Sequence, residues 1–193
     1  MKKIPTIFER DWEGDRSRVI NVPHPDCAWV FAGEGVATRK LDGTCCLFDQ
    51  GKLWKRRELR KGEPAPFEFN EVDHDETTGK RVGWVLVGDG PEYKWHREAL
   101  QHAYEFGGSP LHDGQTYELI GPKIQGNPEG AMRHILIAHD GLAMESDPPR
   151  DFDGLRDFLS GKDIEGIVFH HPDGRMAKIK LRDFGLKRVK AGT

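Results

Sequence analysis

Short runs in which apolar and polar residues alternate, separated by glycine, proline and acidic residues, constrain the fold of this chain more than any other feature. A period of two turns successive side chains to opposite faces of a strand, so that one face can meet a core. On this pattern we expect strands at 27–31, 44–48, 52–56, 82–87, 115–120, 135–139, 164–170 and 177–181.

Helical spacing is rarer. One predicted helix covers 92–106, and a second covers 152–159 after the potential N-cap Asp151. The first helix would share one face among Ala99, Leu100, Ala103 and Phe106. Many strands with a few irregularly placed helices favour an α+β fold of largely antiparallel sheets flanked by helices over a doubly wound parallel sheet.

Length and charge limit the possibilities further. With 193 residues, 36% of them apolar, the chain is expected to form one globular domain over 1–193. A net charge of -3 excludes a uniformly basic coat for nucleic acid, so phosphate binding would need local patches. Segments 52–61 and 175–190 are both rich in lysine and arginine, although such runs also occur as solvated faces.

Nothing in the sequence resembles a membrane span or a signal peptide, and we expect a cytoplasmic protein without disulfides. Cys27, Cys45 and Cys46 lack the spacing of metal ligands along the chain, and the last two should occupy opposite faces of a strand. His170–His171 has no third ligand at zinc spacing, 33–35 is not a P-loop, and Trp95–His96 is expected to serve packing.

Candidate chemistry concentrates at 40–43, Lys-Leu-Asp-Gly. In an extended segment Lys40 and Asp42 point to the same side, and Gly43 lets the chain bend. A lysine amine is nucleophilic only when deprotonated, which requires desolvation or a nearby positive charge such as a metal ion. Taken alone, this tetrapeptide is better explained as a turn with a surface lysine, and a catalytic interpretation needs further matching segments.

Further segments follow in order along the chain: 55–57 (Lys-Arg-Arg), 117–122 (Tyr-Glu-Leu-Ile-Gly-Pro), 165–168 (Glu-Gly-Ile-Val) and 178–180 (Lys-Ile-Lys). Together with 40–43, this series resembles the motifs of the covalent nucleotidyltransferase superfamily of RNA ligases, DNA ligases and mRNA capping enzymes. Segments 40–48 and 121–130 are most similar to small stand-alone ATP-dependent RNA ligases. The resemblance implies the adenylation-domain fold of that superfamily.

Alternation suggests how two of these segments present their residues. In 164–170 it places Glu165 with Ile167 and Phe169 on one face, with Glu165 at a pocket rim. In 178–180 it turns Lys178 and Lys180 to one side, where two cations would suit a phosphate. A surface acid and a solvated edge strand remain the alternatives.

The resemblance implies three nucleotidyl transfers: Lys40 takes AMP from ATP, the AMP passes to an RNA 5′-phosphate, and an RNA 3′-hydroxyl displaces it. The implied catalytic residues are Lys40, Glu165, Lys178 and Lys180. The implied nucleotide contacts, besides both motif lysines, are Thr38, Arg56, Glu118 and Val168. Mg²⁺ or Mn²⁺ would be held by Asp42, Glu118 and Glu165. Arg57 is nearly as good as Arg56, and a residue within 134–139, for example Ile137 or His134, would pack on adenine with Val168.

Only 13 residues follow Lys180, which leaves no room for the C-terminal OB domain of DNA ligases and capping enzymes. That favours an RNA ligase over the alternatives of a DNA ligase or a capping-type guanylyltransferase catalytic domain. A nucleotide- or RNA-binding module without turnover is a further alternative. Such a module would be expected to lack the nucleophile or an acidic motif, whereas Lys40, Glu118 and Glu165 are present.

Overall fold

The computed structural model describes residues 2–105, 110–139, 141–142, 144 and 146–189. The chain forms two compact units. Unit 1 consists of Met1–Lys3 and Asp42–His139, and unit 2 of Ile4–Leu41 and Asp140–Thr193. The chain therefore passes from unit 2 to unit 1 between Leu41 and Asp42, inside the segment predicted to hold the nucleophile. Whether these two units fold together as the single domain expected over 1–193 stays a prediction.

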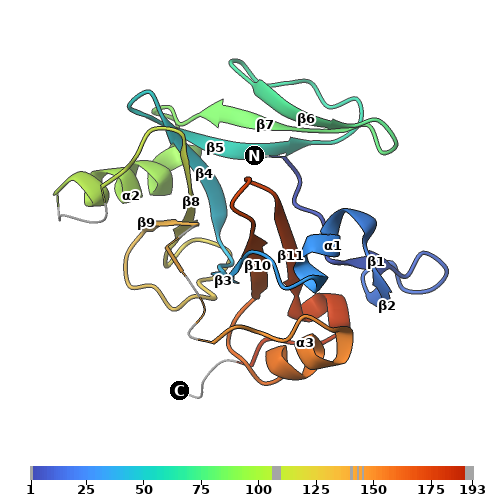
Figure 1. The fold of residues 1–193 in the computed structure, drawn as a ribbon. Coiled ribbons are helices and arrows are strands. Elements are labelled where there is room, and N and C mark those ends of the chain that lie inside the picture. The colour runs from blue at the N-terminus through green and yellow to red at the C-terminus, as the bar shows by residue number, and fades with distance from the viewer. Residues whose placement is uncertain (1, 106–109, 140, 143, 145, 190–193) are drawn as a thin grey trace. The chain divides into compact units, whose positions relative to one another are not determined.

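Unit 1 is built on a six-stranded antiparallel sheet in the order β6-β7-β5-β4-β8-β9 (Figure 1). Its strands are β4 (Thr44–Asp49), β5 (Lys52–Leu59), β6 (Asn70–Asp75), β7 (Lys80–Leu86), β8 (Gln115–Ile120) and β9 (Ile135–Ala138). A 3-10 turn, η2 (Pro91–Tyr93), leads into helix α2 (Lys94–Glu105), which packs beside β9.

Helix α2 covers one face of this sheet. Ala99 packs there in a buried cluster with Cys46, Leu53 and Leu119. Because neighbours along a strand alternate, Cys45 and Glu118 lie on the opposite face. One face of the sheet is therefore apolar and packed against α2, and the other face carries polar candidate residues.

Unit 2 contains a three-stranded antiparallel sheet in the order β11-β10-β3 and a two-stranded sheet, β1-β2. The strands are β1 (Phe8–Arg10), β2 (Val19–Pro23), β3 (Val36–Lys40), β10 (Gly166–His170) and β11 (Met176–Lys180). The helical segments are η1 (Pro25–Cys27), α1 (Ala28–Phe31), α3 (Phe152–Leu159) and η3 (Leu181–Phe184).

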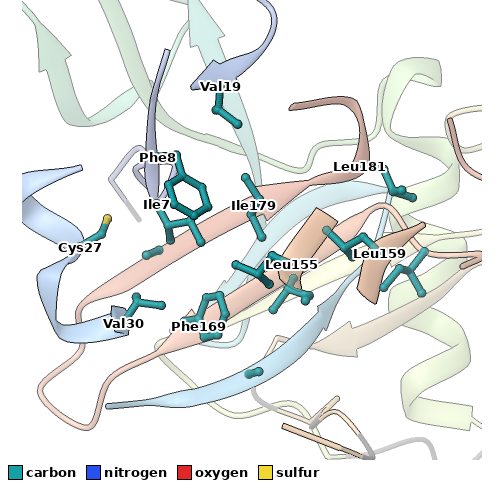
Figure 2. Close-up of a cluster of buried hydrophobic side chains, with 14 of the residues drawn as sticks. Ile7, Phe8, Val19, Cys27, Val30, Leu155, Leu159, Phe169, Ile179 and Leu181 are labelled. Carbon is teal, nitrogen blue, oxygen red and sulfur yellow. The ribbon is translucent and has the colours of Figure 1, made fainter. Parts of the chain in front are cut away.

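The core of unit 2 lies against one face of the three-stranded sheet. Figure 2 shows Phe169 of β10 and Ile179 of β11 together with Leu155 of α3 and Phe8 of β1. Each of these four side chains is at most 2% exposed, and full burial of such a side chain contributes about 1.5–3 kcal/mol. This face is occupied by packing, so the other face of the sheet is the one available for chemistry.

The expected α+β class with largely antiparallel sheets is confirmed, because the pairs of named strands in the described part of the chain are antiparallel, and an isolated bridge between Thr6 and Lys178 is parallel. The helix over 152–159 is also confirmed: the Asp151 side chain accepts a hydrogen bond from Gly154 N at 2.8 Å. The helix predicted over 92–106 begins as the 3-10 turn, and its last residue, Phe106, falls outside the described residues.

The strand predicted at 27–31 was wrong, since this segment is helical. Pro25 begins the first turn, where its fixed φ suits a helix, and the His24 ring accepts a hydrogen bond from Asp26 N. Trp29 and Val30 are adjacent and both buried, which a helix allows and an alternating strand does not. Strands β1, β2, β3 and β6 were not predicted as strands. In the described residues no helix has the length and apolar character needed to cross a membrane.

Candidate active site

In unit 2, β10 lies between β3 and β11 and brings two lysines together. Gly166 is directly opposite Lys40 on one side and Lys180 on the other. A Cβ atom on Gly166 would lie 2.1 Å from the carbonyl oxygen of Ile179, so no other residue fits here without moving the strand. The glycine thus permits the close approach that puts both lysines beside Glu165.

Glu165 joins the two amines. Its Oε2 lies 2.6 Å from Lys40 Nζ, and its Oε1 accepts a hydrogen bond from Lys180 Nζ. The side chains of Lys40, Glu165 and Lys180 are 20%, 15% and 14% exposed. We call this group the lysine–glutamate cluster. It holds two cations and one anion in a mostly buried position, which leaves one positive charge for an anionic ligand.

The pKa of Glu165 is set by two opposed effects. Burial disfavours the charged carboxylate, but the ammonium groups of Lys40 and Lys180 outweigh it and lower the pKa. Glu165 is therefore an anion at neutral pH and acts as counter-ion to both lysines. Attack by Lys40 requires its amine to give up a proton, because an ammonium group has no lone pair.

The position of Glu165 differs from the one that alternation predicted. Ile167 and Phe169 are fully buried in the core, whereas the Glu165 carboxylate bonds to the two lysines. The reason is that β10 begins at Gly166, so the regular alternation does not extend back to Glu165. By contrast, Lys178 and Lys180 do share a face, with Ala177 and Ile179 buried on the other side.

Two residues beyond Gly166 along β10, Val168 is directly opposite Thr38 on β3 and Lys178 on β11. These three residues lie about 7 Å along the strands from Gly166 and the two lysines opposite it. The Thr38 hydroxyl donates to the carbonyl oxygen of Val168 at 3.2 Å and lies 3.0 Å from His170 Nε2. One face of unit 2 thus carries the nucleophile candidate together with Thr38, Val168, Lys178 and Lys180.

Unit 1 carries the remaining candidates. Glu118 is buried, and its Oε1 accepts a hydrogen bond from Gly43 N at 3.0 Å while its Oε2 lies 2.9 Å from His139 Nε2. A Cβ atom on Gly43 would lie 2.3 Å from the carbonyl oxygen of Leu119, so glycine is required at this contact. The backbone N–H of Asp42 donates to Glu129 Oε1 at 3.1 Å.

Arg56 and Arg57 point to opposite faces of the sheet in unit 1. Lys55 is paired with Cys46, so the next residue, Arg56, shares the face of Cys45 and Glu118. Within the described residues, the buried Nε atom of Arg56 has no hydrogen-bond partner. Arg57 is half exposed and forms an ion pair with Glu63 at 2.8 Å. Of the two arginines, Arg56 is therefore the one that lies on the face of Glu118.

His134 and Ile137 are separated in a similar way. His134 Nδ1 lies 2.8 Å from Glu98 Oε1, and its ring stacks on Trp95 of α2 with centroids 4.6 Å apart. His134 is thus held by α2, and the predicted packing role of Trp95 is confirmed. Ile137 is directly opposite Glu118 and shares its face.

Two further histidines were not predicted as site residues. His139 bonds to Glu118, and His170 lies within hydrogen-bond distance of Thr38. Alternation in 135–139 places His139 on the same side as Ile137, so the pattern contained part of the information. The pattern did not reveal that β9 pairs with β8, and it is this pairing that places His139 next to Glu118.

The sequence is similar to known proteins over most of its length. A family model described as RNA ligase 1 matches residues 96–193. RNA ligase 1 from Danio rerio is 26% identical over 276 residues, covering 100% of this chain and 83% of the relative. RNA ligase 1 from Rattus norvegicus is 27% identical over 221 residues, and that from Pongo abelii 25% over 219, each covering 78% of this chain and 67% of the relative.

Proposed function

The chain belongs to the RNA ligase 1 family, and on that premise we propose that it joins an RNA 5′-phosphate end to an RNA 3′-hydroxyl end through AMP carried on Lys40. The observation that carries this proposal is the lysine–glutamate cluster. It presents a mostly buried amine at the end of β3, next to a second cation and a carboxylate that orients both. A nucleophile that must meet a phosphate needs this combination of positioning and positive charge.

In the proposed first step, Lys40 Nζ attacks the α-phosphorus of ATP. A nitrogen–phosphorus bond forms, the bond to the pyrophosphate oxygen breaks, and the amine proton passes to solvent. Lys180 and Lys178, which share a face of β11, offset the negative charge on the phosphate. Glu165 keeps Lys40 and Lys180 in place through its two oxygens.

Two further transfers complete the reaction. An oxygen of the RNA 5′-phosphate attacks the AMP phosphorus, and Lys40 leaves. The RNA 3′-hydroxyl then attacks the activated 5′-phosphate, forms the phosphodiester and releases AMP. We assign adenine contacts to Thr38, Val168 and Ile137, and ribose contacts to Glu118 and Arg56, by resemblance.

By resemblance, we assign Asp42, Glu118 and Glu165 as the residues that would hold Mg²⁺ or Mn²⁺. All three are carboxylates, the ligand class that these cations prefer, and the lowered pKa of Glu165 keeps that group anionic. When bound, the cation would supply positive charge at the phosphate and favour the neutral form of the Lys40 amine.

Labelled ATP tests the first step. Incubation with divalent metal should give AMP bound to the wild-type protein through a bond that is labile in acid and stable in alkali, as a phosphoramidate is, and none on Lys40→Ala. The exposed Lys52→Ala should be labelled like the wild type. Glu165→Ala and Lys180→Ala should lose most labelling without losing much thermal stability. Labelling of Lys40→Ala would rule out the nucleophile, and labelling by GTP in place of ATP would favour the capping-type activity. No labelling of the wild type would favour a binding module.

Substrate class is tested with 5′-pre-adenylated strands, which bypass the first step. We expect joining to an RNA acceptor and much slower joining to a DNA acceptor, because the 2′-hydroxyl near the acceptor end distinguishes the two. Joining should also weaken as salt rises, since phosphate contacts release counter-ions. Equal or faster joining of all-DNA ends would replace the RNA assignment with a DNA ligase.

A further inference from the structure

Three side chains of unit 1 bring different metal-ligand atoms together. They are Cys45 of β4, Glu118 of β8 and His139, which directly follows β9. One sulfur, one oxygen and one nitrogen atom from them all lie within 4.8 Å of one another. Neither the resemblance nor the proposed reaction gives Cys45 or His139 a role.

The strand register explains why they meet. Cys45 is directly opposite Glu118, so their side chains share a face of the sheet. Glu118 is in turn opposite Ile137, and His139, two residues further on, reaches Glu118 with its Nε2 atom. Strands β4 and β8 each supply one ligand, and the third, His139, directly follows β9. Ligands held on or next to paired strands are positioned more firmly than ligands on a free loop.

Two contacts with Thr116 hold His139 in position. Its Nδ1 lies 2.9 Å from the hydroxyl of Thr116, and its backbone N–H donates to the carbonyl oxygen of Thr116 at 3.2 Å. A contact of this kind fixes the orientation of an imidazole whose other nitrogen binds a metal. The backbone N–H of Gly43 donates a hydrogen bond to Oε1 of Glu118, and the other carboxylate oxygen, Oε2, faces His139.

We propose that Cys45, Glu118 and His139 bind a divalent transition metal of the zinc class. The ligands are the Cys45 thiolate, Glu118 Oε2 and His139 Nε2, with water in a fourth position. Tetrahedral zinc places its ligand atoms about 3.3–3.7 Å apart, so small side-chain rotations bring the three atoms from within 4.8 Å to that spacing. His139 Nδ1–H then donates to Thr116, and the thiol proton passes to solvent.

The ligand set selects against magnesium. Mg²⁺ takes oxygen ligands in octahedral geometry, whereas thiolate with imidazole favours zinc and its neighbours in the transition series. Because Glu118 belongs to both the metal site and the proposed ligase site, zinc bound here withdraws it from the reaction. This consequence rests on the proposed function. If it is right, zinc should suppress AMP labelling of the wild type more strongly than labelling of Cys45→Ser, when each protein is compared with its own rate without zinc. Equal suppression would contradict the competition.

Metal binding itself is tested without catalysis. Reduced, chelator-treated full-length protein is titrated with Co²⁺, and we expect one equivalent to produce a thiolate-to-cobalt charge-transfer band that Zn²⁺ removes and Mg²⁺ does not. Cys45→Ser should abolish the band, and His139→Ala should weaken binding at least about tenfold. Thr116→Val, which keeps the side-chain volume, should weaken it about 10–100-fold.

The controls separate this site from general thiol or imidazole binding. Cys46→Ala removes the neighbouring thiol, which faces the other side of the sheet, and the exposed His74→Ala removes a histidine of β6. Both should keep the band, and circular dichroism checks that each variant is folded. A wild-type protein without the band, or an equal loss in Cys45→Ser and Cys46→Ala, would overturn the metal site whether or not the protein proves to be a ligase.

Discussion

Replacing Gly166 by alanine tests whether the close approach of β10 and β11 builds the lysine–glutamate cluster. The added Cβ atom would meet the carbonyl oxygen of Ile179 at 2.1 Å and the Cα atom of Lys180 at 2.8 Å. Both contacts are with backbone, so no side-chain rotation relieves them. The strands must separate by about 1 Å to restore normal contact distances.

The size of the effect follows from that movement. Overpacking of a close contact costs about 1–3 kcal/mol, and each ladder hydrogen bond lost beside it costs about 0.5–1.5 kcal/mol. We therefore expect Gly166→Ala to lower the free energy of unfolding by about 2–5 kcal/mol. For a chain of this length that corresponds to a Tm lower by about 5–15 °C. Since Lys180 moves with β11, AMP labelling should fall as well.

The measurement is thermal and urea unfolding of the full chain followed by circular dichroism, together with AMP labelling below the transition. Gly88→Ala is the matched control, because a Cβ atom there meets only Tyr93, at 4.0 Å. It should change stability by less than about 0.5 kcal/mol. A Gly166→Ala protein as stable as Gly88→Ala would refute the argument that this glycine is required by the strand spacing.

Two predictions concern stability elsewhere. Asp151→Ala removes the cap whose carboxylate accepts from Gly154 N, so the free energy of unfolding in urea should fall by about 1 kcal/mol; Asp151→Asn, which can still cap, should show a smaller loss. His96 is 3% exposed, and burial, reinforced by the charge of Lys55, lowers its pKa from 6.5 to about 4. Between pH 6.5 and 4 the unfolded chain therefore binds a proton that the folded protein does not, and stability should fall by up to about 3 kcal/mol as the pH decreases. His96→Leu should lose this part of the pH dependence in urea titrations, and an unchanged pH profile would contradict it.

Much of the local structure was readable from the sequence. Alternation placed seven of the eight predicted strands within a few residues and turned Lys178 and Lys180 to one side, because the period of two is a property of the extended backbone itself. The Asp151 cap was readable for a similar reason, since it depends on residues three positions apart. The order of the motif residues along the chain also pointed to the family before any contact was known.

Local patterns failed where packing overrode them. The segment 27–31 is apolar enough for a strand, but Pro25 and the neighbouring buried pair Trp29–Val30 make it helical. Glu165 lies one residue before its strand, so alternation assigned it to the wrong neighbours. For 27–31 the wrong period was inferred, because a short apolar run suits a buried helix as well as a strand. For Glu165 the period was right, and the boundary of the strand decided the outcome.

Only the tertiary structure decided which distant residues meet. Lys40 and Glu165 are 125 positions apart, and they form an ion pair because β10 pairs with β3 at Gly166. The same holds for Cys45 and Glu118, which have no metal-ligand spacing along the chain yet stand opposite each other on paired strands. A sequence pattern determines which way a side chain points within its own strand, whereas the strand register, set by packing over the whole unit, determines what it points at.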